Sequence, residues 1–259
     1  WHRWYVYYFE QVVASMCGDS SFALPYWDYA MNVGDSLQLP PAFRTDPSSP
    51  LYEKLRGQGF SNPQGQGTQD VAMNSGGFMP YSQINYNPSL LAPSYFPADV
   101  TASPSPYTKD WFSLGYTGRT EIMPHDNVHD RVGGLMGNVP TAAADPVFFL
   151  HHCQIDRLWA SWQSYTGTTM TFASTSGNAN VPTQAEWNAQ SWSFVDGKGN
   201  LVKQSAPSAM DVKTMGYRYD ALVEKPPQVS LATTLVASGA ESGGEGGKKV
   251  GTLEILLRA

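Results

Sequence analysis

Apolar and aromatic residues fill most of positions 1–16, and only isolated charges such as Arg3 and Glu10 interrupt them. A helix that is apolar over most of its surface is typical of a protein core, so this pattern predicts a largely buried helix at the start of the chain. Gly18 follows the run, and glycine is favoured just past the end of a helix. We therefore expect the first helix to end there.

A second apolar run covers residues 145–163 and predicts another buried helix. It starts with Asp145 and Pro146, which suit the N-cap and the first helical position. Upstream of it, Pro124 suits the start of a shorter helix that extends to Arg131. The sequence thus predicts a helical core built from distant parts of the chain.

The remaining chain shows little periodicity. Residues 31–118 contain many Pro, Gly, Ser and Asn residues and are expected to form long loops with short helices, one of them starting after Ser49-Pro50 and running through Arg56. After residue 165, small and polar residues alternate, which favours loops and short strands. The predicted fold class is therefore mainly α, a helical bundle core with long loops and short peripheral β-strands.

The composition narrows the classes of function. The 259 residues include 16 Lys and Arg against 22 Asp and Glu, which gives a net charge of −6. An acidic chain is a poor partner for nucleic acid or an anionic membrane surface, and no apolar run is long enough to span a bilayer. Two cysteines exclude a disulfide scaffold, and we expect Cys17 and Cys153 to be free, buried thiols.

Histidine is the most informative residue type. Four of the five histidines lie within residues 125–152. His125 and His129 have the i, i+4 spacing that shares one helix face, and His152 lies on the next predicted helix, so three imidazoles can reach one metal ion. An all-imidazole set suits Cu, Zn, Fe or Ni. Taken alone, the first pair would equally fit a solvated helix face.

Longer motifs surround these histidines. The letters HDNVH at 125–129 and DPVFFLHHCQID at 145–156 match the second copper-binding motif of the tyrosinase family, and WHR at 1–3 with Glu10 matches the end of its first copper motif. The chain therefore resembles type 3 copper proteins, namely tyrosinase, catechol oxidase and plant polyphenol oxidase. Four further stretches favour the plant-type branch: HRWYVYY at 2–8, FALPYW at 22–27, DPSSPLY at 46–52 and MGN at 136–138.

The resemblance covers residues 1–165 well and resumes at YRYD, 217–220, which is similar to the tyrosine motif that closes the family's catalytic domain. It implies a catalytic domain over residues 1–220, in which the helical bundle holds a dicopper site. Residues 221–259 are then expected to form a linker and a partial C-terminal segment.

The resemblance also implies two copper ions with three imidazole ligands each. His125, His129 and His152 match the ligands of the second copper, and His2 matches the third ligand of the first. His151 is the non-ligand neighbour in the family motif. Because adjacent helical residues point about 100° apart, we expect it to pack or to support the site. Five histidines cannot supply six ligands, so the other two are expected upstream of residue 1.

Two carboxylates are candidates for roles near the copper pair. Glu121 stands four residues before His125, where a plant-type glutamate orients a water, so it is the candidate catalytic residue; an ordinary surface glutamate is the alternative. Asp156 follows the last ligand by one turn, and the resemblance implies that it pairs with Arg3 or Arg157. A surface charge pair with Arg157 is the alternative.

Three residues are candidates for substrate binding. Asp126 follows the first ligand of the second copper at a position where family members vary, and aspartate there implies a base or a charge that changes substrate preference. Asp130 follows the second ligand and is expected to point toward the mouth of the site. Val139 matches a position where many plant enzymes carry a shielding phenylalanine. Valine implies a wider entrance there, or a loop residue with no role.

The implied function is oxidation of o-diphenols to o-quinones by O2, with hydroxylation of monophenols as well in tyrosinases. The implied partners are O2 and a small phenol. Two alternatives stay open: an O2 carrier of the mollusc haemocyanin kind, and an inactive or mononuclear copper relic. The plant-type resemblance implies the plastid, in the thylakoid lumen, with secretion as the second choice. The sequence predicts neither the native phenol nor an oligomeric state.

Overall fold

The computed structural model describes residues 1–29, 38–57, 73–75, 84–92, 119–175 and 181–227. The chain divides into two units, Trp1–Pro226 and Pro227–Ala259, and nearly all described residues belong to the first. Much of the expected loop region 31–118 and most of the expected C-terminal segment 221–259 lie outside the described residues.

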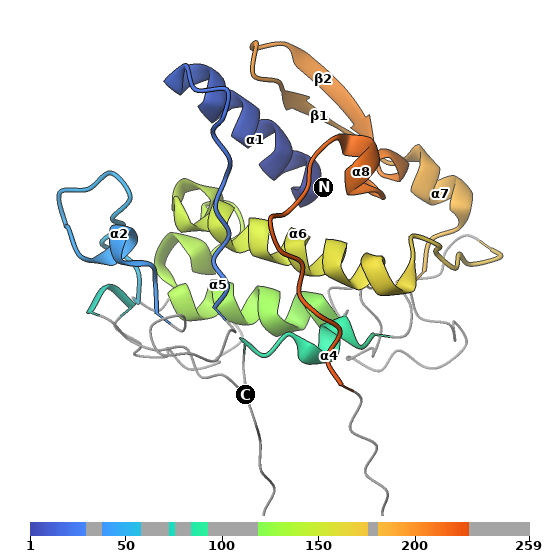
Figure 1. Ribbon diagram of the computed structural model, residues 1–259, viewed down its shortest axis with the longest axis horizontal. Coiled ribbons are helices and arrows are strands. Elements are labelled where there is room, and N and C mark those ends of the chain that lie inside the picture. Colours follow the sequence, from blue (N-terminus) through green and yellow to red (C-terminus); the bar gives the residue numbers. More distant parts are fainter. Residues whose placement is uncertain (30–37, 58–72, 76–83, 93–118, 176–180, 228–259) are drawn as a thin grey trace, which may run out of the picture. The chain divides into compact units, whose positions relative to one another are not determined.

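Two long helices pack against each other at the centre of the first unit, α1 (His2–Cys17) and α6 (Val147–Thr166) (Figure 1). The rings of Phe9 and Phe149 stack between them, with centroids 3.4 Å apart and an interplanar angle of 6°. The first helix ends as predicted. Gly18 has φ 66° and ψ 21°, a left-handed conformation that is cheap only for glycine, and its N–H donates to the carbonyl of Ser15.

Helix α6 is buried along most of its 20 residues. It begins at Val147, one residue later than predicted, and the Asp145 carboxylate accepts a 3.0 Å hydrogen bond from the Val147 N–H. The same carboxylate pairs with the Arg56 guanidinium at 2.6 and 2.8 Å, and neither side chain is exposed. A buried ion pair therefore fixes the start of α6 to the loop that carries Arg56.

The predicted helix after Pro50 is wrong, because residues 51–57 contain turns and no helix. Arg56 donates to the backbone carbonyls of Phe43 and Leu51 as well as to Asp145. The carbonyls of Phe43 and Leu51 thus accept hydrogen bonds from a buried guanidinium instead of from the N–H groups of a helix. This long-range contact outweighs the local preference for a helix.

A shorter helical segment lies beside α6: the π-helical turn η3 (Glu121–Asp126), followed directly by α5 (Asn127–Val132) (Figure 1). Met123 has the non-helical angles φ −143° and ψ 113°, so the continuous helix begins at Pro124, as predicted. The 3-10 turns η4 (Gly134–Gly137) and η5 (Ala142–Ala144) then lead back to α6.

Gly134 lies where two backbones touch. Its φ is +56°, and an added Cβ would lie 2.5 Å from the carbonyl oxygen of Leu55. Gly134→Ala is expected to lower the free energy of unfolding by about 1–3 kcal/mol, because strain and overlap act together. Gly216→Ala is the control, since Gly216 has φ +84° and no atom within 4 Å of an added Cβ. Urea unfolding should show the smaller loss for the control, and equal losses would contradict the close approach.

Smaller elements complete the unit: α2 (Pro41–Arg44), η2 (Met73–Ser75), α4 (Asn87–Leu90), α7 (Gln184–Ala189), β1 (Ser191–Val195), β2 (Leu201–Ser205), η6 (Pro207–Ala209) and α8 (Val212–Met215). The two strands form an antiparallel hairpin, with Ser191 opposite Ser205 and Val195 opposite Leu201, and β1 packs on α1 (Figure 1). The mainly helical fold with short peripheral strands is confirmed.

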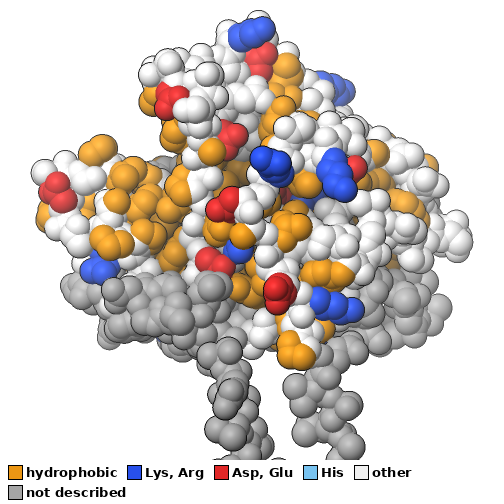
Figure 2. Space-filling view, viewed as in Figure 1, with side chains coloured by type: hydrophobic (Ala, Val, Ile, Leu, Met, Phe, Trp, Pro, Cys, Tyr) orange, Lys and Arg blue, Asp and Glu red, His pale blue; other side chains and the backbone are white. Residues whose placement is uncertain are grey.

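The surface carries both signs of charge. On the face drawn in Figure 2, acidic and basic side chains are interspersed among polar and apolar ones. Among the described residues, no helix combines the length and the apolar character needed to cross a membrane.

Candidate metal centre

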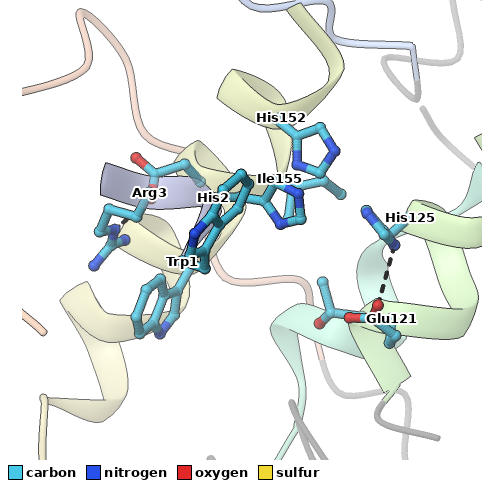
Figure 3. Close-up of a pocket in the computed structure, with 10 residues that line it drawn as sticks. Trp1, His2, Arg3, Glu121, His125, His152 and Ile155 are labelled. Carbon is cyan, nitrogen blue, oxygen red and sulfur yellow. Dashed lines mark hydrogen bonds and ion pairs between the residues drawn. The ribbon is translucent and has the colours of Figure 1, made fainter. Parts of the chain in front are cut away.

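A cavity of about 130 Å³ lies where the start of α1 meets η3 and α6 (Figure 3). The residues that line it are Trp1, His2, Arg3, Thr120, Glu121, His125, His152, Ile155, Asp156 and Trp159. Three segments distant in sequence thus contribute imidazoles and carboxylates to one cavity.

Four histidines meet beside this cavity. One nitrogen from each of His125, His129, His151 and His152 lies within 4.8 Å of the corresponding nitrogens of the other three. The Nε2 atoms of His129 and His152 are 3.2 Å apart. Two imidazoles that bind one metal ion at about 2.0–2.1 Å hold their nitrogens roughly 3–4 Å apart. The spacing of this pair is therefore already that of two ligands of one ion.

His151 comes closer to this group than the sequence suggested. The 100° separation between neighbouring helical side chains does not keep its ring away, because the His125 ring packs over it with centroids 5.4 Å apart and an interplanar angle of 20°. His151 is fully buried, and neither ring nitrogen has a hydrogen-bond partner. The structure therefore places His151 within reach of a metal held by the other three.

His2 lies outside that group of four but touches it. At the first position of α1, its ring stacks on that of His152 with centroids 4.0 Å apart and an interplanar angle of 22°. It lines the cavity, as Figure 3 shows. The role at a second metal position that the family motif implies for His2 stays a prediction.

Burial keeps most of these imidazoles neutral. It is the largest cause that lowers the pKa of His129 to about 3, and the nearby His125 lowers it further. The pKa values of His151 and His152 are also well below the usual histidine value, because of burial first and neighbouring imidazoles second. A neutral imidazole offers the lone pair that a metal ion binds.

These lowered pKa values predict acid sensitivity of the metal-free protein. His129, His151 and His152 resist protonation when folded but accept protons near pH 6.5 when unfolded, so stability falls as the pH drops below 6.5. Each contributes a slope of up to about 1.4 kcal/mol per pH unit. Urea midpoints of chelator-treated protein should fall between pH 7.5 and 5.5. A flat profile would mean that these rings are solvated.

Glu121 forms one wall of the cavity. Its Oε1 atom lies 3.5 Å from Nδ1 of His125, and Figure 3 shows the two side chains facing each other. Burial raises the pKa of Glu121, and the nearby His125 offsets part of that rise. A carboxyl group with a raised pKa beside a candidate metal site is suited to proton transfer. The Glu121 side chain is 21% exposed and lines the cavity, and its catalytic role stays a prediction.

None of the three candidate substrate residues lines the cavity. Asp126 Oδ1 lies 2.9 Å from Nδ1 of His125, a contact that the sequence did not predict. Asp130 is exposed. Loss of part of the water around its carboxyl group, and the charge of Asp126, raise its pKa. Val139 is 94% exposed, in the turn between η4 and η5. Roles of Asp130 and Val139 in substrate binding stay predictions.

Asp156, which lines the cavity, is the centre of a buried hydrogen-bond network. Its carboxylate accepts a hydrogen bond from Arg3 Nε on one oxygen and from the hydroxyls of Tyr217 and Tyr219 on the other. The Arg3 guanidinium also lies over the ring of Trp159, 3.6 Å from its centroid. This network joins α1, α6 and the segment after α8.

The structure decides between the two partners expected for Asp156. Arg3 is the partner, and Arg157 donates instead to Asp28 Oδ2 at 2.7 Å. The link to the YRYD motif was not predicted. The signal for it was present, because Tyr217 and Tyr219 alternate along the chain, and alternating residues of an extended segment point to the same side.

The two cysteines are free, as predicted. Cys153 is buried in α6, but Cys17 is exposed, so the expectation of a buried thiol is wrong at that position. The last turn of α1 carries Cys17, and the neighbouring Met16 is 83% exposed, which shows that this turn extends beyond the core.

The donor set fits a transition metal. Nδ1 of His129 lies 2.9 Å from the Met136 carbonyl oxygen, which only accepts, so Nε2 carries the lone pair toward His152. Nδ1 of His152 and both nitrogens of His151 are buried without partners. Such atoms are costly in a core unless a ligand, ion or water satisfies them. The cluster can hold an ion that favours imidazole, such as copper or zinc.

Comparison with protein families decides between these ions. The common central domain of tyrosinase matches residues 1–165. The chain belongs to the tyrosinase family. All five histidines and Glu121 lie in the matched region. Members of this family bind copper, which the imidazole cluster is suited to hold.

Individual relatives agree with the family. Polyphenol oxidase A1 of Vicia faba, a chloroplastic protein, is 29% identical over 84% of this chain and 35% of its own length. A tyrosinase of Hahella sp. (strain CCB-MM4) is 29% identical over 85% of this chain and 45% of its own. The solved structure of latent apple tyrosinase is 27% identical, with a TM-score of 0.57, over 87% of this chain and 48% of that one. The chain thus spans less than half the length of each of these relatives.

Proposed function

We propose that this protein is a type 3 copper phenol oxidase, which oxidises o-diphenols to o-quinones with O2. The observation that carries the proposal is the convergence of four imidazoles, two of them buried and two partly buried, beside a cavity of about 130 Å³ within the tyrosinase domain. The relatives named polyphenol oxidase and tyrosinase support an oxidase over an O2 carrier. Monophenol hydroxylation remains a second activity to be tested.

In this proposal His125, His129 and His152 bind one copper ion and His2 belongs to the other. A pair of three-imidazole sites needs six ligands, and the sequence has five histidines. We therefore expect one copper per chain from these residues alone, and two where further imidazoles complete the site. Residues 1–220 form the catalytic domain, and 221–259 follow it as a linker and partial C-terminal segment.

Bound copper would supply the centre that takes up O2 and accepts electrons from the phenol. The balance is two o-diphenols, each losing two electrons and two protons, for one O2 reduced to two waters. The residues of this chain orient the substrate and manage those protons. The cavity is lined by Trp1 and Ile155, which offer apolar surface to a phenol ring, and by Glu121, whose burial-raised pKa suits it to receive a phenolic proton.

The test measures copper and turnover together. Protein in which further imidazoles complete the site should, when loaded with copper, contain two coppers per chain and convert catechol to its quinone, followed by quinone absorbance and O2 uptake. Two coppers with reversible O2 binding but no turnover would support the carrier alternative. One copper per chain or none in that protein would support the mononuclear or inactive alternative.

The proposed location is the plastid, and the chloroplastic polyphenol oxidases among its relatives support it. Fractionation of the source cells with an antibody against this chain tests it. Recovery from the secreted fraction would favour the second choice.

A further inference from the structure

The imidazoles of His125 and His129 each have a hydrogen-bond acceptor at Nδ1. Nδ1 of His129 faces the Met136 carbonyl at 2.9 Å, and Nδ1 of His125 faces Asp126 Oδ1 at 2.9 Å. A carbonyl and a carboxylate accept hydrogen bonds, so both Nδ1 atoms carry the proton. In their neutral forms both rings then have the same tautomer, with a lone pair on Nε2. The Asp126 carboxylate and the Met136 carbonyl thus favour the tautomer in which Nε2 of His125 and Nε2 of His129 can bind an ion.

We propose that Asp126 is a positioning residue that acts through His125. Its carboxylate fixes the ring orientation and the tautomer of His125 and makes Nε2 a stronger electron donor. This is the carboxylate–histidine–metal arrangement found at many metal sites, where the outer partner contributes strongly to metal affinity. The inference rests on the proposed function for the identity of the metal. In this inference Asp126 contacts His125, a proposed metal ligand, and does not contact the substrate as the sequence predicted.

Two carboxylates approach His125, and their geometry divides their roles. Asp126 is at hydrogen-bond distance from Nδ1, whereas Glu121 is 3.5 Å away, too far for a good bond. Glu121 lines the cavity and Asp126 does not. Figure 3 shows the His125 ring between Glu121 on one side and the rings of His2 and His152 on the other. Asp126 therefore supports the ligand, and Glu121 remains free to face the substrate.

The burial of the two groups agrees with this division. The His125 side chain is 14% exposed and that of Asp126 is 45% exposed. One carboxylate oxygen can thus hold the ring while the group stays hydrated, so the charge costs little to keep. Asp126 directly follows His125 in the chain, so its carboxylate reaches the His125 ring without help from any other segment. The contact is therefore local.

The experiment compares Asp126→Ala, Asp126→Asn and Asp19→Asn by competition titration with Cu²⁺ and Co²⁺. Asp126→Ala should weaken both metals by about 10–100-fold. Asp126→Asn keeps an acceptor oxygen and should recover part of the loss. Asp19→Asn removes one exposed charge that bonds only to Ser21 and should change nothing. Nitrogen NMR of the metal-free histidines should show a mixed tautomer for His125 in Asp126→Ala alone.

The outcomes separate this inference from the proposed function. Wild-type affinity in Asp126→Ala together with a raised KM for catechol would overturn the inference and return Asp126 to substrate binding. Wild-type affinity with an unchanged His125 tautomer would overturn it as well. If the wild-type protein binds copper but does not oxidise catechol, the proposed function fails, while the metal titration still tests Asp126.

Discussion

Replacing Asp156 by alanine is expected to lower the free energy of unfolding by about 3–5 kcal/mol, the usual cost of removing one partner from a buried ion pair. Arg3 and Asp156 are 3% and 4% exposed, so water cannot replace the lost carboxylate. The hydroxyls of Tyr217 and Tyr219 would lose their acceptor at the same time. Urea unfolding at neutral pH, followed by far-UV circular dichroism, measures the loss.

Two milder variants calibrate this result. Tyr219→Phe removes one hydrogen bond to a charged group and leaves the ion pair, so it should cost about 1.5–3 kcal/mol. Asp156→Asn keeps the shape but removes the charge opposite Arg3, so it should fall between Tyr219→Phe and Asp156→Ala. If Asp156→Ala costs no more than Tyr219→Phe, the network does not anchor the helices as the structure indicates.

The same network affects the metal centre. Arg3 directly follows His2 on α1, and Asp156 lies one turn after His152 on α6. Because Arg3 and Asp156 pair, the two helices are fixed at the level where the rings of His2 and His152 stack. Asp156 therefore joins the helix that carries His2, the proposed ligand of one copper, to the helix that carries His152, one of the three proposed ligands of the other.

The sequence predicted what depends on neighbours along the chain. Aromatic runs, Gly18 and Pro124 predicted the helices because burial, a left-handed end and a fixed φ are local requirements. The convergence of His125 and His129 follows from the same helical period. Where a residue's surroundings are set by a few positions on either side, the pattern was sufficient.

The residue pattern alone could not predict most contacts between distant segments; the pairing of Arg3 with Asp156 was one of two alternatives that the family resemblance implied. Arg56 and Asp145 are separated by 89 positions, and their pairing replaces a predicted helix with turns. The closeness of His151 to the other three histidines depends on how η3 packs beside α6. The geometry of one ideal helix gives no information on that packing. The contact of Asp126 with His125 is local, but choosing it over a substrate contact required the side-chain geometry.

Replacing His129 by alanine is expected to lower the affinity for Cu²⁺ by more than about 100-fold, because loss of an outer partner alone costs 10–100-fold. His129 Nε2 is the atom that faces His152 Nε2 at 3.2 Å, so its loss removes one half of the closest nitrogen pair. Competition titration measures the affinity, and near-UV circular dichroism checks that the core remains packed.

His151→Gln is the matched test on the neighbouring helix, and it decides between three and four imidazole ligands. We expect its Cu²⁺ affinity to stay within about tenfold of wild type, a free-energy change of 1.4 kcal/mol or less. The reason is that His152, and not His151, presents Nε2 to His129, while the His151 ring packs against those of His125 and Tyr29. A loss as large as that of His129→Ala in a folded variant would make His151 a fourth ligand. The copper EPR spectrum would then change with it, because the number of coordinated nitrogens sets the hyperfine pattern.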